Sequence, residues 1–157
     1  MSSFTSRISA LGLDVGRKRV GVAGCDGTGL IATGLTTVHR QSFVEDVAQF
    51  QRLVSERQAQ ILVVGLPYNM DGTVGFQAKQ VQKYVKRLSQ VLNLPVEFVD
   101  ERLTSVQAME LIRAEKRSSR DKGLIDRKAA AIILQQWLDE RRSRQRLSHP
   151  PESTPTP

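Results

Sequence analysis

The sequence predicts an α/β fold in which helices pack on a five-stranded mixed sheet. Three observations lead to this fold class: a run of three strand-like segments joined by short turns, two later apolar segments that alternate with helical patterns, and a final helix. Strands joined by tight turns pair antiparallel, whereas strands joined through a helix pair parallel. The predicted order is β-β-β-α-β-α-β-α, with a C-terminal helix after it.

The first third of the chain predicts an antiparallel meander. Residues 8–14 (ISALGLD) are apolar on both faces of a strand, and residues 19–25 (RVGVAGC) are small and β-branched. The Asp26-Gly27 pair is a hairpin signal, so we expect the third strand over residues 30–38.

Helix and strand patterns alternate in the middle of the chain. Apolar residues at helical spacing predict a helix over residues 42–58, and a second over residues 76–92 that ends before Pro95. Between them, the run ILVVG at residues 61–65 is typical of a strand buried in the middle of a sheet. Residues 96–100 (VEFVD) are expected to form the fifth strand.

Two further helices are expected after the fifth strand. The segment TSVQ at residues 104–107 fits a capping box, which opens a third helix that should end near Glu115. Residues 113–122 (RAEKRSSRDK) suggest a polar, mobile and basic loop. The last helix is expected over residues 125–142, with Trp137 in the core.

These elements predict one domain with two short ends. Residues 1–7 are polar and expected to be flexible, residues 8–142 form the domain, and residues 143–157 form a disordered tail because their Pro-rich end cannot build a core. A meander followed by βαβ crossovers is the ribonuclease H-like plan.

Composition narrows the function classes. The 157 residues include 23 Lys and Arg against 16 Asp and Glu, a net charge of +7, which favours an anionic partner such as nucleic acid, although a merely soluble basic protein fits equally well. The single cysteine, Cys25, excludes an intrachain disulfide and a cysteine-based zinc site. No apolar run approaches the roughly 20 residues of a membrane span, and the first seven residues hold no apolar signal core. We therefore expect a cytoplasmic protein without a membrane partner.

Acidic residues stand where predicted elements end or begin. Asp14 ends the first strand, Asp100 and Glu101 end the fifth, and Asp126 begins the last helix. Each has an ordinary interpretation alone: a turn aspartate, a surface pair beside Arg102, or an acid at a helix N-terminus. Together they favour a site, because parallel strands open onto one edge of the sheet, where α/β proteins bind ligands.

Carboxylates gathered in one cleft need a counter-charge. At about 5 Å and an effective dielectric constant of about 20, each pair repels by about 3 kcal/mol. All-oxygen ligands suit Mg²⁺ or Mn²⁺, and two such ions about 4 Å apart activate water and stabilise the leaving oxygen of a phosphodiester. This chemistry needs no histidine base, and the chain has only two histidines.

Basic residues near these acids are candidates for contact with nucleic acid. They are Lys18, Arg19, Arg102, Arg117, Arg120 and Lys122. Together with Arg113 and Lys116, the last three belong to the predicted basic loop, for which a solvated surface is the alternative. The loop at residues 69–73 either grips a nucleotide or only turns the chain. Aromatic residues make up 5% of the chain, which disfavours a stacking platform for single strands.

Four segments then resemble a known family. They are LGLDVGRKRVGVA, VVGLPYNMDGTVGFQA, FVDERLTS and KGLIDRKAAAIILQQWL. In this order they resemble the bacterial YqgF family, also called RuvX, over about residues 8–140. The resemblance implies a ribonuclease H-like nuclease that matures the 5′ end of precursor 16S rRNA, with Asp14, Glu101 and Asp126 as its catalytic and metal-binding positions. Asp100 is the less favoured member of its pair. Arg127 and Lys128 depart from the family pattern; they either compete with metal for Asp126 or add phosphate contacts.

The preferred hypothesis is a metal-dependent endonuclease that acts on precursor rRNA, in some cases within pre-ribosomal particles. A Holliday-junction resolvase acting on branched DNA would use the same site and should be a two-fold dimer, whereas the sequence leaves monomer and dimer open. A third hypothesis is a ribosome-assembly protein that binds RNA without cleaving it. An ATP-binding module of the actin and sugar-kinase type would need a second domain.

Overall fold

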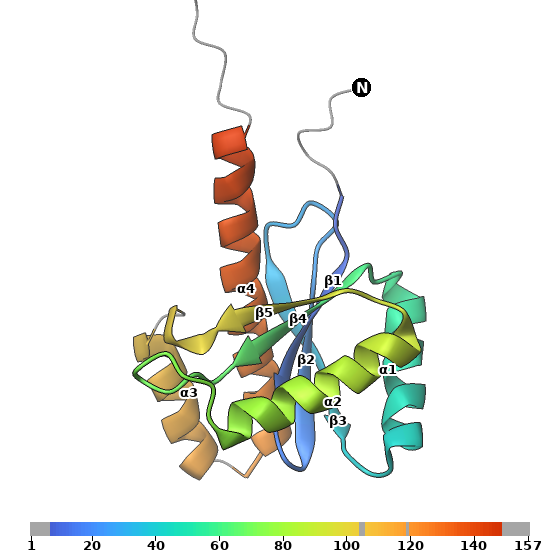
Figure 1. Cartoon of the computed structure of the whole chain (residues 1–157), viewed down its shortest axis with the longest axis vertical. Coiled ribbons are helices and arrows are strands. Elements are labelled where there is room, and N and C mark those ends of the chain that lie inside the picture. Colours follow the sequence, from blue (N-terminus) through green and yellow to red (C-terminus); the bar gives the residue numbers. More distant parts are fainter. Residues whose placement is uncertain (1–6, 104–105, 119, 149–157) are drawn as a thin grey trace, which may run out of the picture.

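The computed structural model describes residues 7–103, 106–118 and 120–148. The strands are β1 (Ala10–Val15), β2 (Arg19–Cys25), β3 (Ala32–His39), β4 (Ile61–Leu66) and β5 (Val96–Asp100). The helices are α1 (Phe43–Arg57), α2 (Phe76–Leu92), α3 (Val106–Ser118) and α4 (Lys122–Ser148), with a short 3₁₀ turn at Glu101–Leu103. Figure 1 shows these elements around one sheet.

The sheet has the strand order β3-β2-β1-β4-β5. β1 pairs antiparallel with β2, and β2 with β3, which confirms the predicted meander. β1 pairs parallel with β4, and β4 with β5, so these three strands end at the same edge. The predicted α/β class and mixed five-stranded sheet are therefore confirmed.

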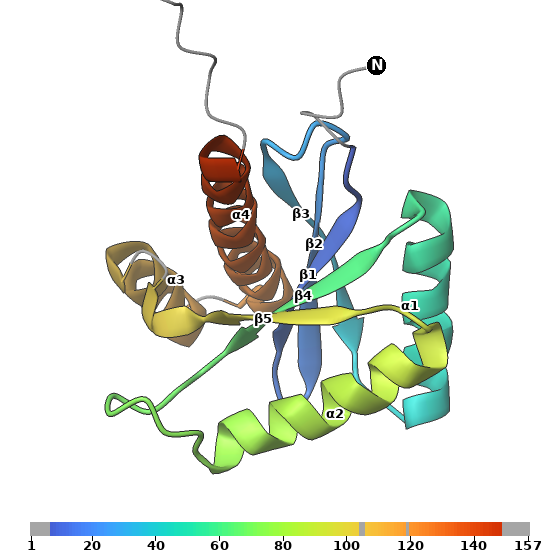
Figure 2. The ribbon, with the colours of Figure 1, turned by 45° about the horizontal axis from the view of Figure 1, so that its top comes forward.

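The two faces of the sheet carry side chains of different size. Figure 2 shows α4 crossing one face while α1 and α2 cover the other. The α1–α2 face presents larger apolar residues of the central strands: Leu11, Leu13, Val20, Val22, Leu62 and Val64. On the α4 face stand small residues, including Ala10, Gly12, Gly21 and Ala23. Small residues let a helix approach the strands closely, so α4 lies almost on the backbone of the sheet.

The last two helices differ from the prediction. Residues 113–118 belong to α3, and α4 begins at Lys122 and continues to Ser148, so the predicted basic loop over 113–122 and the helix end at residue 142 were wrong. Charge suggested a loop, but Arg, Ala, Glu and Lys are all strong helix formers. The capping box falls on Thr104 and Ser105, which lie outside the described residues, as do residues 1–6 and 149–157.

Trp137 is a core residue, as predicted. It is 5% exposed and packs among α4 and sheet residues, and its Nε1 donates to Glu97 Oε2 at 2.9 Å. In the described part of the chain, no helix combines the length and apolarity that crossing a membrane requires.

Candidate active site

The pleat of β1 directs Asp14 toward α4. Side chains alternate between the two faces of a strand, and Leu11 and Leu13 face α1 and α2. Gly12 faces the other way, where a β-carbon would lie 2.6 Å from Leu134 Cβ of α4. Asp14 has the parity of Gly12, so its carboxyl points into the space beneath α4.

A glycine on the neighbouring strand brings Asp126 to the same place. Gly21 of β2 is the register partner of Asp14. A β-carbon at Gly21 would lie 2.0 Å from the carbonyl oxygen of Asp126, so only glycine lets this turn of α4 rest on the sheet. Asp126 is consequently 3% exposed and lies over the strand next to Asp14.

Strand parity also separates Asp100 from Glu101. On β5, Glu97 bonds to Trp137 of α4, and Val99 packs in the same cluster. Glu101 shares their parity and lies toward α4, where its Oε1 is 2.9 Å from the position of a β-carbon at Gly65 of β4. Asp100 has the opposite parity. Glu101 is therefore the member of the pair that faces the other carboxylates.

The three predicted carboxylates line one cavity. Asp14, Glu101 and Asp126 surround a hollow of about 260 Å³ at the edge where β1, β4 and β5 end. Burial, the nearby Glu101 and, to a smaller extent, Asp126 raise the pKa of Asp14 to about 7, although Lys116 and Arg113 act in the opposite direction. Removal from water likewise raises the pKa of Glu101, against the effect of Arg113. The carboxylates are close enough to repel one another through a medium that screens poorly.

Cations from the same chain neutralise this cavity. The Asp126 carboxylate accepts from Arg19 Nε at 2.7 Å and from Lys116 Nζ at 2.6 Å. Arg113 Nη2 lies 2.8 Å from Glu101 Oε2. Within the described residues, no group of three or more His, Cys, Asp or Glu side chains is placed to hold a metal ion in this arrangement.

The donor chemistry nevertheless fits a divalent ion. The cavity offers carboxylate oxygens from three elements, and oxygen is the ligand that Mg²⁺ and Mn²⁺ prefer. Burial and the neighbouring carboxylates raise the pKa of Asp14, so a divalent ion beside it would stabilise its charged form. Two of those cations, Lys116 and Arg113, come from α3 and are 37% and 57% exposed, so they can withdraw into solvent.

The predicted nucleic-acid residues fall into four places. Arg19, Arg120 and Lys122 line a second hollow beside the cavity. Arg117 lies on α3 next to Arg113 along a shallow surface depression, and Lys18 is exposed in the β1–β2 turn.

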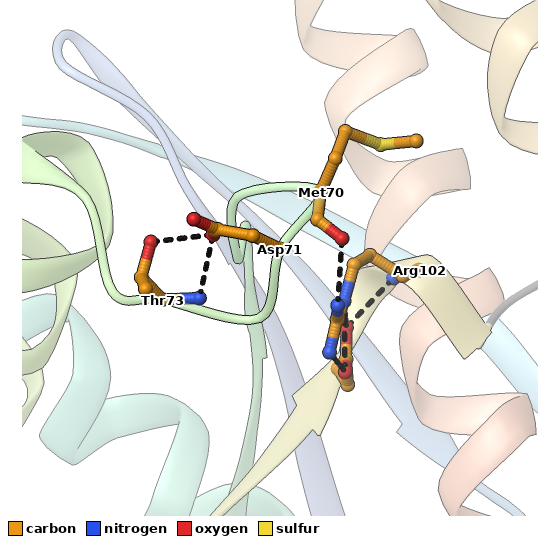
Figure 3. A network of polar contacts seen from close by, with 5 residues as sticks. Met70, Asp71, Thr73 and Arg102 are labelled. Atoms are coloured by element: carbon orange, nitrogen blue, oxygen red, sulfur yellow. Dashed lines mark hydrogen bonds and ion pairs between the residues drawn. The ribbon is translucent and has the colours of Figure 1, made fainter.

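Arg102 has a different environment. Its Nη2 pairs with Asp100 Oδ2 at 2.7 Å, its guanidinium lies 5.4 Å from the centre of the Tyr68 ring, and its Nη1 donates to the Met70 carbonyl at 3.4 Å (Figure 3). Arg102 therefore links the end of β5 to the loop after β4.

The loop at residues 69–73 forms most of its polar contacts internally. Asp71 Oδ1 accepts from the Thr73 amide at 3.0 Å and hydroxyl at 2.6 Å (Figure 3), and the Asn69 amide donates to the Thr73 carbonyl at 2.9 Å. Gly72 has φ +87°, a conformation that favours glycine. These contacts describe a self-contained turn.

Arg127 and Lys128 point away from the Asp126 carboxylate. Arg127 lines the second hollow, and Lys128 Nζ pairs with Glu115 Oε1 at 3.2 Å. The cations that occupy Asp126 are instead Arg19 and Lys116. The sequence places Arg19 beside Asp14 and predicts a loop around Lys116, and neither pattern indicates an ion pair with Asp126.

Comparison with known proteins assigns the family. A family model described as "RuvX: Holliday junction resolvase" matches residues 8–140. The chain belongs to the RuvX family. A protein of Crocosphaera subtropica is 69% identical to this RuvX member over 138 residues, covering 87% of this chain and 96% of that protein. One from Rippkaea orientalis is 71% identical over 137 residues, covering 87% and 99%. Both carry the name "Putative pre-16S rRNA nuclease".

Solved structures show the same fold. RuvC of Thermus thermophilus superposes with a TM-score of 0.54 at 16% identity, covering 87% of this chain and 97% of that chain. The same RuvC in complex with a Holliday junction substrate gives a TM-score of 0.52 at 14% identity, covering 85% and 95%. The likeness confirms the ribonuclease H-like fold that the order of elements predicted.

Proposed function

We propose that this RuvX family member is a divalent-metal-dependent endonuclease that cleaves precursor 16S rRNA at its 5′ end in the cytoplasm. The observation that carries the proposal is the convergence of Asp14, Glu101 and Asp126, which are far apart in sequence, on one cavity. The names of the relatives support the substrate, and the net charge of +7 supports a polyanionic partner.

The three carboxylates are the residues that would hold Mg²⁺ or Mn²⁺. When bound, such an ion supplies an activated water and charge stabilisation at the scissile phosphate. Asp14 would contribute an oxygen from the end of β1, Glu101 from the 3₁₀ turn directly after β5, and Asp126 from α4. Arg19, at 2.7 Å from Asp126, orients that carboxylate, while Lys116 and Arg113 on α3 are near enough to contact a phosphate at the cavity mouth.

Asp14→Asn tests the catalytic assignment. Loss of one ligand should remove several kcal/mol of charge stabilisation, or about a thousandfold in rate at 1.36 kcal/mol per decade, with the fold intact by circular dichroism. The assay offers a precursor 16S rRNA fragment with Mg²⁺ or Mn²⁺. Full activity of the variant would refute the assignment.

The Asp100–Glu101 pair provides a matched control. Glu101→Gln should lose activity as Asp14→Asn does, whereas Asp100→Asn should retain activity within about tenfold, because Asp100 bonds to Arg102 outside the cavity. Equal losses in both variants would show that strand parity does not select the ligand.

A junction resolvase is the second candidate, favoured by the description of the family model. A four-way DNA junction assayed beside the RNA fragment separates the two functions, and light scattering adds the oligomeric state, since paired symmetric cuts require a two-fold dimer. RNA binding without cleavage of either substrate would favour a non-catalytic assembly protein.

A further inference from the structure

A second hollow lies on the far side of the Arg19–Asp126 ion pair. It measures about 450 Å³, within the roughly 300–1,000 Å³ of ligand-binding clefts. Arg19 lines it while its Nε bonds to Asp126, so this one side chain forms a wall between the hollow and the carboxylate cavity. The remaining lining comes from β3, from Arg120 and Asp121 just before α4, and from the start of α4.

The charge of this hollow is strongly positive. Four cations line it, Arg19, Arg120, Lys122 and Arg127, together with one carboxylate, Asp121. The Asp121 Oδ1 atom accepts from the Leu124 amide at 3.0 Å, so it caps α4. The hollow also lies at the first turn of α4, where the helix dipole adds further positive charge.

Arg127 lines the hollow, and no described residue pairs with its side chain. Its Nε is buried, and among the described residues the side chain has neither a hydrogen bond nor an ion pair. Arg57 Nε is buried and unpartnered too, but Arg57 Nη2 donates to the Cys25 carbonyl at 3.0 Å. A buried donor without an acceptor is unfavourable, and the charge of this guanidinium has no counter-ion among the described residues, so an anion in the hollow would neutralise it.

We propose that this hollow is a binding site for a backbone phosphate of the substrate, which holds the strand on the β3 side of the carboxylate cavity. The inference rests on the proposed nuclease function only for the identity of the substrate. Arginine suits phosphate because its fork of N–H donors matches two phosphate oxygens. Arg127 and Arg120 contact the phosphate, and Arg19 couples the site to Asp126.

Adjacent residues on α4 allow a matched test. Arg127→Gln removes one charge from the hollow, and Lys128→Gln removes one charge from the neighbouring exposed residue, which pairs with Glu115 instead. Binding of a precursor 16S rRNA fragment is measured by fluorescence anisotropy. EDTA is present, so that the RNA is not cleaved during the measurement and binding is scored independently of catalysis. Arg127→Gln should weaken binding about fivefold to tenfold and reduce the slope of log K against log salt by about one, whereas Lys128→Gln should change binding less than twofold.

A second variant separates binding from folding. Arg120 is exposed, so Arg120→Gln should leave the melting temperature unchanged. Like Arg127→Gln, it should weaken RNA binding. RNA with a 5′-phosphate and with a 5′-hydroxyl should respond alike if the site takes a backbone phosphate; an effect confined to 5′-phosphorylated RNA would instead assign a terminal phosphate. Equal affinities of Arg127→Gln and Lys128→Gln would overturn the proposal. The same measurement on a DNA junction keeps the test valid if precursor rRNA is not the substrate.

Discussion

The carboxylate cavity and the second hollow, which Arg19, Arg120, Lys122 and Arg127 line, lie on either side of Arg19. They differ in how their charges are balanced. In the cavity, the carboxylates of Asp126 and Glu101 pair with Arg19, Lys116 and Arg113. In the hollow, Arg120, Lys122 and Arg127 have no acidic partner among the described side chains. The described side chains therefore supply counter-ions to the acidic region but form no ion pair with Arg120, Lys122 or Arg127.

Under the proposed function, this difference would affect how substrate and metal bind. A substrate can add its negative charge to the hollow without breaking a protein contact. A metal ion bound by these carboxylates would instead compete with Lys116 for Asp126 and with Arg113 for Glu101, and both cations extend from α3 and are partly exposed. Withdrawal of these two cations would release them to contact the phosphates of the same substrate.

The largest effect is expected at the glycine that supports both regions. In Gly21→Ala, the new β-carbon would lie 2.0 Å from the Asp126 carbonyl oxygen and would lift this turn of α4, moving Asp126 and Arg127 together. We expect a loss of about 3 kcal/mol in the free energy of unfolding, measured in urea. Gly27→Ala is the control, since no atom lies within 4 Å of its β-carbon position, and should change stability by less than about 0.5 kcal/mol. Comparable losses in the two variants would show that α4 does not depend on Gly21.

A smaller effect is expected from Asp14→Asn in the carboxylate cavity, where the change in stability should depend on pH. Folding raises the pKa of Asp14 from 3.8 to about 7, so the folded protein holds more protons than the unfolded chain between these values, and stability falls as pH rises through that window. Asp14→Asn removes this loss. Without metal, its melting temperature should exceed that of the wild type by several degrees at pH 8, and the difference should vanish toward pH 4.

Asp139→Asn serves as the control for this pH series. Asp139 is an exposed carboxylate near the middle of α4, paired with Arg142, and its replacement should produce no comparable gain at pH 8. A lower melting temperature for Asp14→Asn than for the wild type at pH 8 would contradict the repulsion inferred in the cavity.

The smallest effect concerns the counter-ion from α3. Lys116→Met removes a charge that competes with a metal ion for Asp126, so Mn²⁺ affinity by calorimetry should rise about fivefold, which corresponds to about 1 kcal/mol. Lys128→Met, which removes an equal charge paired with Glu115, should leave the affinity within twofold. Weaker Mn²⁺ binding by Lys116→Met would mean that Lys116 supports the ion site.

Much of the candidate site could be predicted from local patterns. Apolar runs and turn signals involve only neighbouring residues, so the ends of the first and fifth strands could be predicted from the sequence. Asp14 and the Asp100–Glu101 pair lie at those ends. Strand parity could also have selected Glu101, because Glu97 and Val99 share its face. Gly21 and Gly65 were signals that the sequence analysis did not use. A glycine within a strand often marks a position where another part of the chain comes close to the strand backbone.

The α/β class, the order of the strands along the chain and the acidic residues at their ends could be predicted from the residues alone, because they follow from short-range hydrophobic periodicity and turn chemistry. That Lys116 and Arg19 meet at Asp126, and that Arg127 lines a separate hollow, became evident only from the folded arrangement. Those outcomes depend on where α3 and α4 lie on the sheet, and that placement results from packing between residues distant in the chain, about which local periodicity carries no information.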